Sequence, residues 1–373
     1  MRKILIIILP LLVLWACNNP KDVSIVDRFK TIQPIAHKVF NTQNGADELL
    51  NPNNLVIVGN TMTTNNLQSP KIFTSIDIVT GRVIKHWGDR GQGPDEFQGM
   101  VSIYNNYSET GLNIWDNLTL KLYYSSNSDL ESDSVYFYEI PTGINKREGG
   151  IDLRDAAIQI DTFMFFVTGG NNNKRFSLVD LKNNEVKEIG DFPAENINNT
   201  SSNRDAIWRN MAYQGRIIYN RSLKKIVYVS RNSEMFEIYN TNGSDAELAM
   251  GSYTTTPKYR EVAQNTGGRT GWMGVNEYLT NGKGRNLWAT TSDENIFILY
   301  QNYSQKKGID TKLNFPLEKA DMVLVFDWDG KPVKIYELDC FPHSITYDKA
   351  RNRLWAIHNN EDSLDPEIIY FEL

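Results

Sequence analysis

A short apolar segment recurs six times along the sequence, and this repetition constrains the fold more than any other feature. The segments are residues 55–59, 112–116, 163–167, 226–230, 296–300 and 354–358. Their centres lie about 60 residues apart on average, at irregular intervals. Irregular spacing is unfavourable in a stacked solenoid, whereas the blades of a β-propeller tolerate loops of different lengths. The repetition therefore predicts six propeller blades.

A hairpin pattern accompanies the apolar segments in four of the units. Alternating apolar residues flank a turn in residues 76–84, 178–186, 236–243 and 325–333. Asn-Gly and Asp-Gly pairs in two of them supply the positive φ angles that tight hairpins require. We therefore expect four antiparallel strands in each unit: an inner strand, the apolar strand and an outer hairpin.

Composition agrees with an all-β protein. The 373 residues include 18 Tyr, 16 Phe and 8 Trp, and aromatic side chains fit the half-buried faces of strands. A hydrophobic share of 40% supports a globular core, which excludes disordered, collagen-like and disulfide-scaffold proteins. A net charge of −6 without a long basic cluster disfavours nucleic acid and anionic membrane surfaces as partners.

The last repeat is too short to form a complete blade. Residues 342–373 have room for about three strands, while residues 23–40 contain extended stretches with no other partner. An N-terminal strand paired into the last blade would close the ring and cover an exposed sheet edge. The sequence thus predicts a single six-bladed β-propeller domain, residues 23–373, closed by its N-terminal strand.

The first residues resemble a bacterial lipoprotein signal. Arg2 and Lys3 precede an apolar run, residues 4–15, that is shorter than the roughly 20 residues of a membrane-spanning helix. The run ends in Leu-Trp-Ala-Cys, which is similar to a lipobox with Cys17 as the lipidated residue. We expect residues 1–16 to be a signal peptide and residues 17–22 a lipidated tether. The alternative is an ordinary secretory signal.

This resemblance implies a cellular location. The chain would be lipid-anchored in the bacterial cell envelope, either periplasmic or on the surface of the outer membrane, and would touch the membrane through the anchor only. Cys340 would then have no intramolecular disulfide partner. We interpret Cys340 as a small buried hydrophobic residue.

Three stretches of the sequence resemble one protein family. Residues 87–97, Trp-Gly-Asp-Arg-Gly-Gln-Gly-Pro-Asp-Glu-Phe, resemble a Gly-x-Gly-Pro-Gly-Glu-Phe motif in which Asp95 replaces the third glycine. Residues 294–300 with 325–332, and residues 344–348 with 353–356, resemble the later blades of the same family. These are the TolB-like six-bladed β-propeller lipoproteins of Bacteroidota. The resemblance implies the fold and an envelope location, and it assigns no catalytic residue.

Motifs for phosphate, metal or nucleophile chemistry are weak. The glycine-rich residues 91–94 end in Pro94, which lacks a donor, and no Lys-Ser/Thr pair follows, so a structural turn with Glu96 bonded to its backbone is the preferred interpretation. The four histidines show no metal-ligand spacing, and residues 327–330 form a hairpin tip rather than a calcium hand. We predict no catalytic residue, no metal and no cofactor.

Propeller architecture locates a candidate binding face. Loops between second and third strands meet the inter-blade connections at one end of the channel, where polar and aromatic side chains suit a sugar or peptide. The candidate residues are Asp116, Asn171, Arg204, Trp208, Arg231, Arg260, Trp272, His343 and His358. The alternative is that these loops are merely solvated, with Trp208 and Trp272 capping the core.

Two functions of different classes follow. The favoured one is a non-enzymatic envelope lipoprotein that binds a glycan, a peptide or a protein partner. The alternative is a calcium-dependent hydrolase or lactonase, with the metal held in the central channel by Glu, Asn and Asp side chains. Residues 302–321, a long connection with Tyr303, Phe315 and Leu317, are either a lid over the channel mouth or a tolerated insertion.

Overall fold

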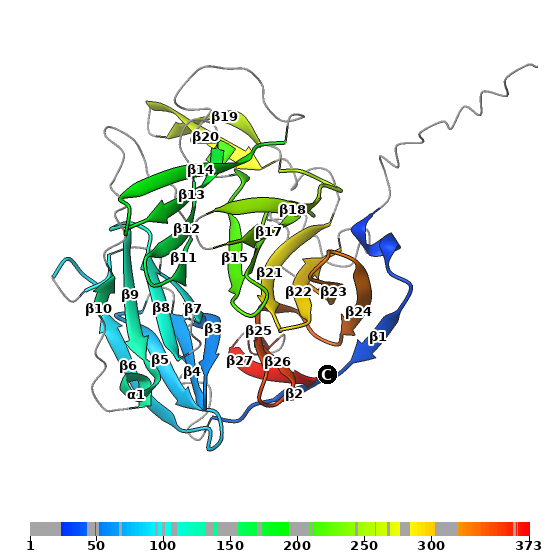
Figure 1. Ribbon diagram of the computed structural model, residues 1–373. Coiled ribbons are helices and arrows are strands. Elements are labelled where there is room, and N and C mark those ends of the chain that lie inside the picture. Colours follow the sequence, from blue (N-terminus) through cyan, green and yellow to red (C-terminus); the bar gives the residue numbers. More distant parts are fainter. Residues whose placement is uncertain are drawn as a thin grey trace, which may run out of the picture.

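Six four-stranded blades surround a central channel in the described chain (Figure 1). The computed structural model describes residues 24–42, 49, 52–66, 69–93, 96–98, 101–105, 110–131, 138–140, 156–169, 174–193, 209–210, 212–242, 245–257, 259–266, 269–276, 284–302, 320–360, 363 and 365–373. The prediction of an all-β, six-bladed propeller with four-stranded antiparallel blades is confirmed.

Each blade begins with its innermost strand. The first blade is β3 (Pro52–Val58), β4 (Thr61–Asn66), β5 (Lys71–Asp77) and β6 (Val83–Asp89). The second blade is β7 (Val101–Asn105), β8 (Gly111–Asp116), β9 (Lys121–Ser126) and β10 (Tyr138–Ile140). The third blade is β11 (Ala157–Asp161), β12 (Met164–Thr168), β13 (Lys174–Asp180) and β14 (Glu185–Asp191). The fourth blade is β15 (Gly215–Asn220), β16 (Lys225–Ser230), β17 (Phe236–Thr241) and β18 (Ala246–Ser252). The fifth is β21 (Arg285–Thr291), β22 (Asn295–Gln301), β23 (Met322–Asp327) and β24 (Pro332–Leu338), and the sixth contains β25 (Pro342–Asp348), β26 (Arg353–Asn359) and β27 (Pro366–Glu372).

The N-terminal segment completes the ring, as the short last repeat predicts. Strand β2 (His37–Val39) pairs antiparallel with β27 and supplies the outer strand of the sixth blade. Strand β1 (Ile32–Ile35) instead adds a fifth, parallel strand to the fifth blade, beside β24. The chain therefore bridges the seam between two blades, which Figure 1 shows as a blue segment along the outside of both.

The first blade departs from the predicted repeat. Its apolar segment, residues 55–59, covers the end of the innermost strand β3, whereas the other five segments fall on second strands. The second strand of this blade, β4, consists of Thr, Met and Asn residues and is nevertheless buried along its whole length. Hydrogen bonds make this burial tolerable: Asn65 accepts the Asn54 amide at 2.9 Å and donates to the Val101 carbonyl at 2.7 Å.

A two-stranded hairpin stands outside the six blades. Strands β19 (Tyr259–Thr266) and β20 (Arg269–Asn276) pair with each other, and in the sequence they follow the fourth blade and precede the fifth. The repeat pattern does not predict this hairpin. The described helices are the short η1 (Ile25–Arg28) and α1 (Asn127–Glu131), and neither has the length or apolarity of a membrane span.

The glycine-rich segment forms the predicted structural turn between the first two blades. The Glu96 carboxylate accepts the Gly93 amide at 2.6 Å, and Phe97 behind it is fully buried against Phe73 and Tyr123. A Cβ atom at Gly91 would lie 2.0 Å from Glu96 Oε2, so a larger residue would displace the carboxylate.

Two smaller predictions are also confirmed. Cys340 is buried in the core. Asp327 closes the β23–β24 hairpin tip by accepting the Asp329 and Lys331 amides.

Candidate functional site

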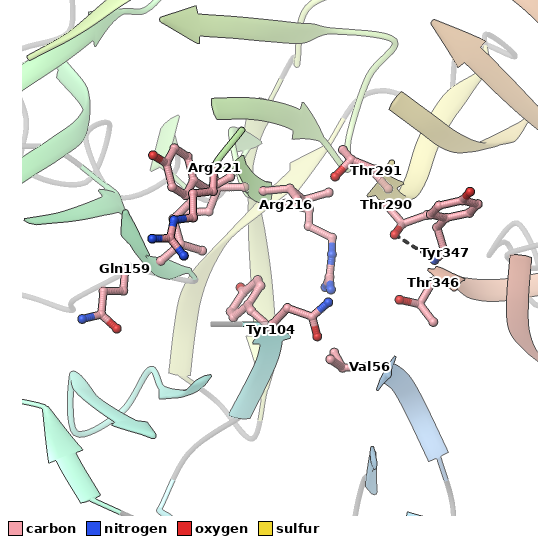
Figure 2. Close-up of a pocket in the computed structure, with 15 residues that line it drawn as sticks. Val56, Tyr104, Gln159, Arg216, Arg221, Thr290, Thr291, Thr346 and Tyr347 are labelled. Atoms are coloured by element: carbon pink, nitrogen blue, oxygen red, sulfur yellow. Dashed lines mark hydrogen bonds between the residues drawn. The ribbon is translucent and has the colours of Figure 1, made fainter. Parts of the chain in front are cut away.

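The innermost strands of all six blades converge on one cavity of about 110 Å³ in the central channel (Figure 2). Its walls combine hydroxyl, amide, phenol and guanidinium groups with a few aliphatic side chains. They are formed by Val56, Tyr104, Asn105, Ile158, Gln159, Arg216, Ile217, Ile218, Tyr219, Arg221, Ala289, Thr290, Thr291, Thr346 and Tyr347. Each blade contributes because alternate residues of an inner strand face the axis of a propeller.

Arg216 is the charged group in the middle of this channel. It belongs to β15, and Figure 2 shows its side chain extending toward the axis, with Tyr104 on one side and Thr346 and Tyr347 on the other. Its guanidinium carbon lies 4.0 Å from the Trp288 ring centroid and 5.1 Å from that of Tyr104. These distances are typical of cation–π contacts, which orient the planar guanidinium without using its N–H donors.

The surroundings of Arg216 disfavour its positive charge. Burial lowers the pKa of Arg216 to about 10; Tyr104 opposes this shift, and the nearby Arg231 cation reinforces it. At pH 7 the side chain is still charged, because this pKa lies well above 7. Its Nε is buried without a hydrogen-bond acceptor among the described residues. The channel therefore contains a half-buried cation with one buried donor, Nε, that no described residue accepts.

A more deeply buried arginine provides the contrast. Arg175 is 3% exposed and forms a salt bridge with the fully buried Glu237 of the neighbouring blade. Burial alone would lower the pKa of Arg175, but the Glu237 carboxylate, with Tyr239 and Tyr228, raises it above the ordinary value. Arg175 is thus compensated within the fold, whereas no carboxylate is among the groups that act on Arg216 in the described chain.

A cavity of about 200 Å³ adjoins the first at one end of the channel. The two share Asn105, Tyr219, Thr291 and Tyr347 in their walls. Its mouth is formed by the turns between first and second strands, and two carboxylates line it. Asp348 is bonded to Arg351 at 3.0 Å and Asp293 to Lys349, so each negative charge already has a cationic partner.

The predicted binding face lies at the other end of the channel, where the second strands end. Asp116 is fully buried there and accepts the amides of Gln98, Leu118 and Thr119, which is a structural role. Arg231 is exposed at this end and close enough to Arg216 to affect its pKa. His343 is half-buried, and His358 is buried with its Nε2 3.5 Å from Glu367.

The remaining predicted site residues cannot be placed as side chains. Asn171, Arg204 and Trp208 lie outside the described residues, as do residues 303–319 of the proposed lid, residues 302–321. Arg260 and Trp272 lie on the hairpin strands β19 and β20. Among the predicted residues whose side chains the structure describes, Arg231 is the one whose charge acts on Arg216 of the channel cavity, and the binding face as a whole stays a prediction.

Sequence reasoning did not select Arg216 or the residues around it. One local signal was available, because Arg216 follows Gly215 and precedes the apolar residues Ile217 and Ile218 at the start of an inner strand. A charged residue in such a strand either has a buried partner or faces the channel. The sequence does not distinguish these two cases.

One described group combines three types of metal-ligating side chain. Ligand atoms of His37, Asp339 and Cys340 lie within 4.8 Å of one another at the seam between the last two blades. His37 Nδ1 is 2.9 Å from Asp339, which also accepts the His37 amide at 3.1 Å. These bonds attach β2 to the β24–β25 connection, and we interpret the group as a closure contact.

Comparison with known proteins agrees with this architecture. A member of the DUF4221 family from Bacteroides vulgatus is 12% identical, with a TM-score of 0.51 over 91% of this chain and 92% of that protein. A protein from Bacteroides fragilis whose name describes it as exported is 10% identical, with a TM-score of 0.51 over 94% and 96% of the two chains. Identities this low establish similarity of fold alone. No curated protein matches the chain.

A family model provides the assignment. The model described as TolB-like 6-blade propeller-like matches residues 49–350, which cover the first five blades and the innermost strand, β25, of the sixth. This range contains the glycine-rich turn and all six inner strands around Arg216. The chain therefore belongs to the TolB-like 6-blade propeller family.

Proposed function

We propose that this protein is a lipid-anchored binding module of the bacterial cell envelope that holds part of a glycan, peptide or protein partner in its central channel. The observation that carries the proposal is the convergence of all six inner strands on one polar cavity around Arg216. Small-ligand sites are typically concave, with a few oriented polar groups among aromatic side chains. Tyr104, Tyr347 and the neighbouring threonines supply such a lining.

The hydrolase alternative receives no comparable support. A calcium ion requires several converging oxygen ligands, of which carboxylates are the strongest. The described lining of the about 110 Å³ cavity contains the guanidinium groups of Arg216 and Arg221 and no carboxylate, and guanidinium groups repel a divalent cation. The two carboxylates of the adjoining cavity are already paired with Arg351 and Lys349. We therefore favour binding over metal-dependent hydrolysis.

Ligand binding in the channel can be tested by filling it. Thr291 lines both cavities, and Thr291→Trp would occupy their shared wall. We expect a panel of defined oligosaccharides and short peptides to contain a ligand of the wild-type protein that this variant binds about tenfold or more weakly. Val186→Trp is the matched control, because Val186 is 55% exposed on an outer strand. Equal binding by Thr291→Trp and wild type would contradict a channel site.

Anchoring rests on Cys17, which lies outside the described residues. Cys17→Ser removes the thiol that would carry the lipid, and the expected result is release of the protein from the membrane fraction. Fractionation of the producing cells, with labelled-lipid incorporation as a second readout, measures this change. A variant that sediments with membranes as wild type does would show that Cys17 is not the anchor.

A further inference from the structure

Two buried donors beside the channel cavity have no acceptor in the described protein. They are Arg216 Nε and the indole Nε1 of Trp288, which belong to side chains stacked 4.0 Å apart. A buried polar group without a partner destabilises a fold, and a charged one does so more strongly. Two such donors on neighbouring blades, in one stack beside a cavity, indicate a place where an acceptor is supplied from outside the protein.

The charges around Arg216 specify the sign of that acceptor. The ionisable groups that affect Arg216 in the described chain are the Tyr104 phenol and the Arg231 cation. Arg231 is exposed at the end of the channel where the second strands end, so both arginines contribute positive potential at this end. A cation that folding removes partly from water, as Arg216 is, costs stability unless a counter-ion is present. The missing component is an anion.

We propose that Arg216 binds the carboxylate of an acidic sugar, a uronic acid, and that this sugar is the part of the partner held in the channel. The inference rests on the proposed binding function and names its ligand class. A planar carboxylate matches the guanidinium fork in a bidentate pair.

The remaining lining suits the rest of a sugar ring. Hydroxyl groups of Thr290, Thr291 and Thr346 and the amides of Asn105 and Gln159 face or border the same cavity. They both donate and accept hydrogen bonds, as sugar hydroxyls do. Tyr219 and Tyr347 add aromatic surface where the two cavities adjoin, and aromatic faces pack against the apolar face of a pyranose.

The wild-type protein tests the ligand class without any substitution. Glucuronate and glucose differ in one position, a carboxylate in place of a hydroxymethyl group, and calorimetric titration compares them directly. We expect glucuronate to bind about tenfold or more tightly than glucose, because a hydrogen bond to a charged group is stronger than one between neutral groups. Equal binding of the two sugars, or binding of neither, would overturn the proposal.

A peptide C-terminus carries the same carboxylate and is the competing source. An N-acetyl dipeptide with a free C-terminus, compared with its C-terminal amide, tests this source. We expect neither peptide to displace glucuronate. Tighter binding of the free-acid peptide than of glucuronate would replace the sugar by a peptide and overturn the assignment.

Arg216→Met separates ligand binding from a structural role. We expect this variant to bind glucuronate about tenfold to a hundredfold more weakly. Without ligand its Tm should rise by about 2–5 °C, because an uncompensated buried charge is removed. Lys182→Met, in an exposed turn of the third blade, controls for the loss of one positive charge and should change neither value. A fall in Tm with unchanged glucuronate binding would make Arg216 a structural residue.

Failure of the uronic-acid assignment can be distinguished from failure of the proposed binding function. Thr291→Trp tests whether anything binds in the channel, whatever its charge, whereas Arg216→Met and the sugar pair test the anionic group. Loss of panel binding in Thr291→Trp together with equal affinity for glucuronate and glucose would retain the binding module and reject its acidic ligand.

Discussion

Replacement of Glu237 by Ala is expected to lower the free energy of unfolding by about 3–5 kcal/mol. Glu237 is fully buried on β17, and its carboxylate forms a salt bridge with Arg175 of the third blade. It also accepts the hydroxyls of Tyr239 at 2.8 Å and Tyr253 at 2.5 Å. Its removal leaves a buried guanidinium without a counter-charge at the interface between two blades. Urea unfolding of the purified protein measures the loss.

Two controls sharpen this test. Glu247→Ala removes an exposed carboxylate from the neighbouring strand β18 and should change stability by at most about 0.5 kcal/mol. The double variant Arg175→Met, Glu237→Leu removes both charges and should recover most of the lost stability, because an apolar pair of similar volume replaces a buried ion pair. A loss in Glu237→Ala no larger than that in Glu247→Ala would show that the salt bridge does not join the blades.

Deletion of residues 23–40 is expected to lower Tm by on the order of 10 °C or to prevent folding. The deletion removes β2 from the sixth blade and β1 from the fifth, so two sheet edges lose their outer strands. It also removes Ile25, which is fully buried, and Phe29 and Phe40, which pack edge-to-face on Phe326 and Trp355. Thermal unfolding followed by circular dichroism measures the effect.

Deletion of residues 18–22 is the matched control for this truncation. These residues lie outside the described chain and are predicted to be a tether, so their loss should leave Tm unchanged. The structure identifies a single contact within the N-terminal segment, between His37 and Asp339, that contributes to ring closure. His37→Ala would remove the Nδ1 contact with Asp339 and should produce a small part of the full loss. Equal Tm values for the two truncations would contradict closure by the N-terminal segment.

Much of the fold was predictable because its signals are local. The apolar segments and hairpin turns repeat within each blade, and hydrogen bonding between consecutive strands requires no information from distant residues. Two elements differ from the predicted repeat, each for a physical reason. Strand β4 has a polar sequence and is nevertheless buried, and the Asn65 side chain donates to the Val101 carbonyl of the next blade, a partner that only the assembled blades provide. The β19–β20 hairpin interrupts the repeat without altering it.

The candidate site was far less predictable. The polar loops of the predicted face could be found by counting strands, but the cavity is formed by side chains of six strands that are far apart in sequence. Which residues of those strands face the axis depends on the register of each strand, and an error of one residue reverses the choice. For this reason the sequence pattern predicted Arg231, on an adjacent loop, as a site residue but not Arg216.

By itself, the sequence determined the number of blades, their order and the use of the N-terminus to complete the last one. Tertiary structure decided that β1 joins the fifth blade in parallel while β2 joins the sixth. It also decided which groups surround Arg175 and Arg216. Arg175 meets Glu237 across a blade interface, whereas Arg216 meets two aromatic rings and no described carboxylate. Strand patterns arise from neighbouring residues, but compensation of a buried charge depends on which distant group folding brings within a few ångströms.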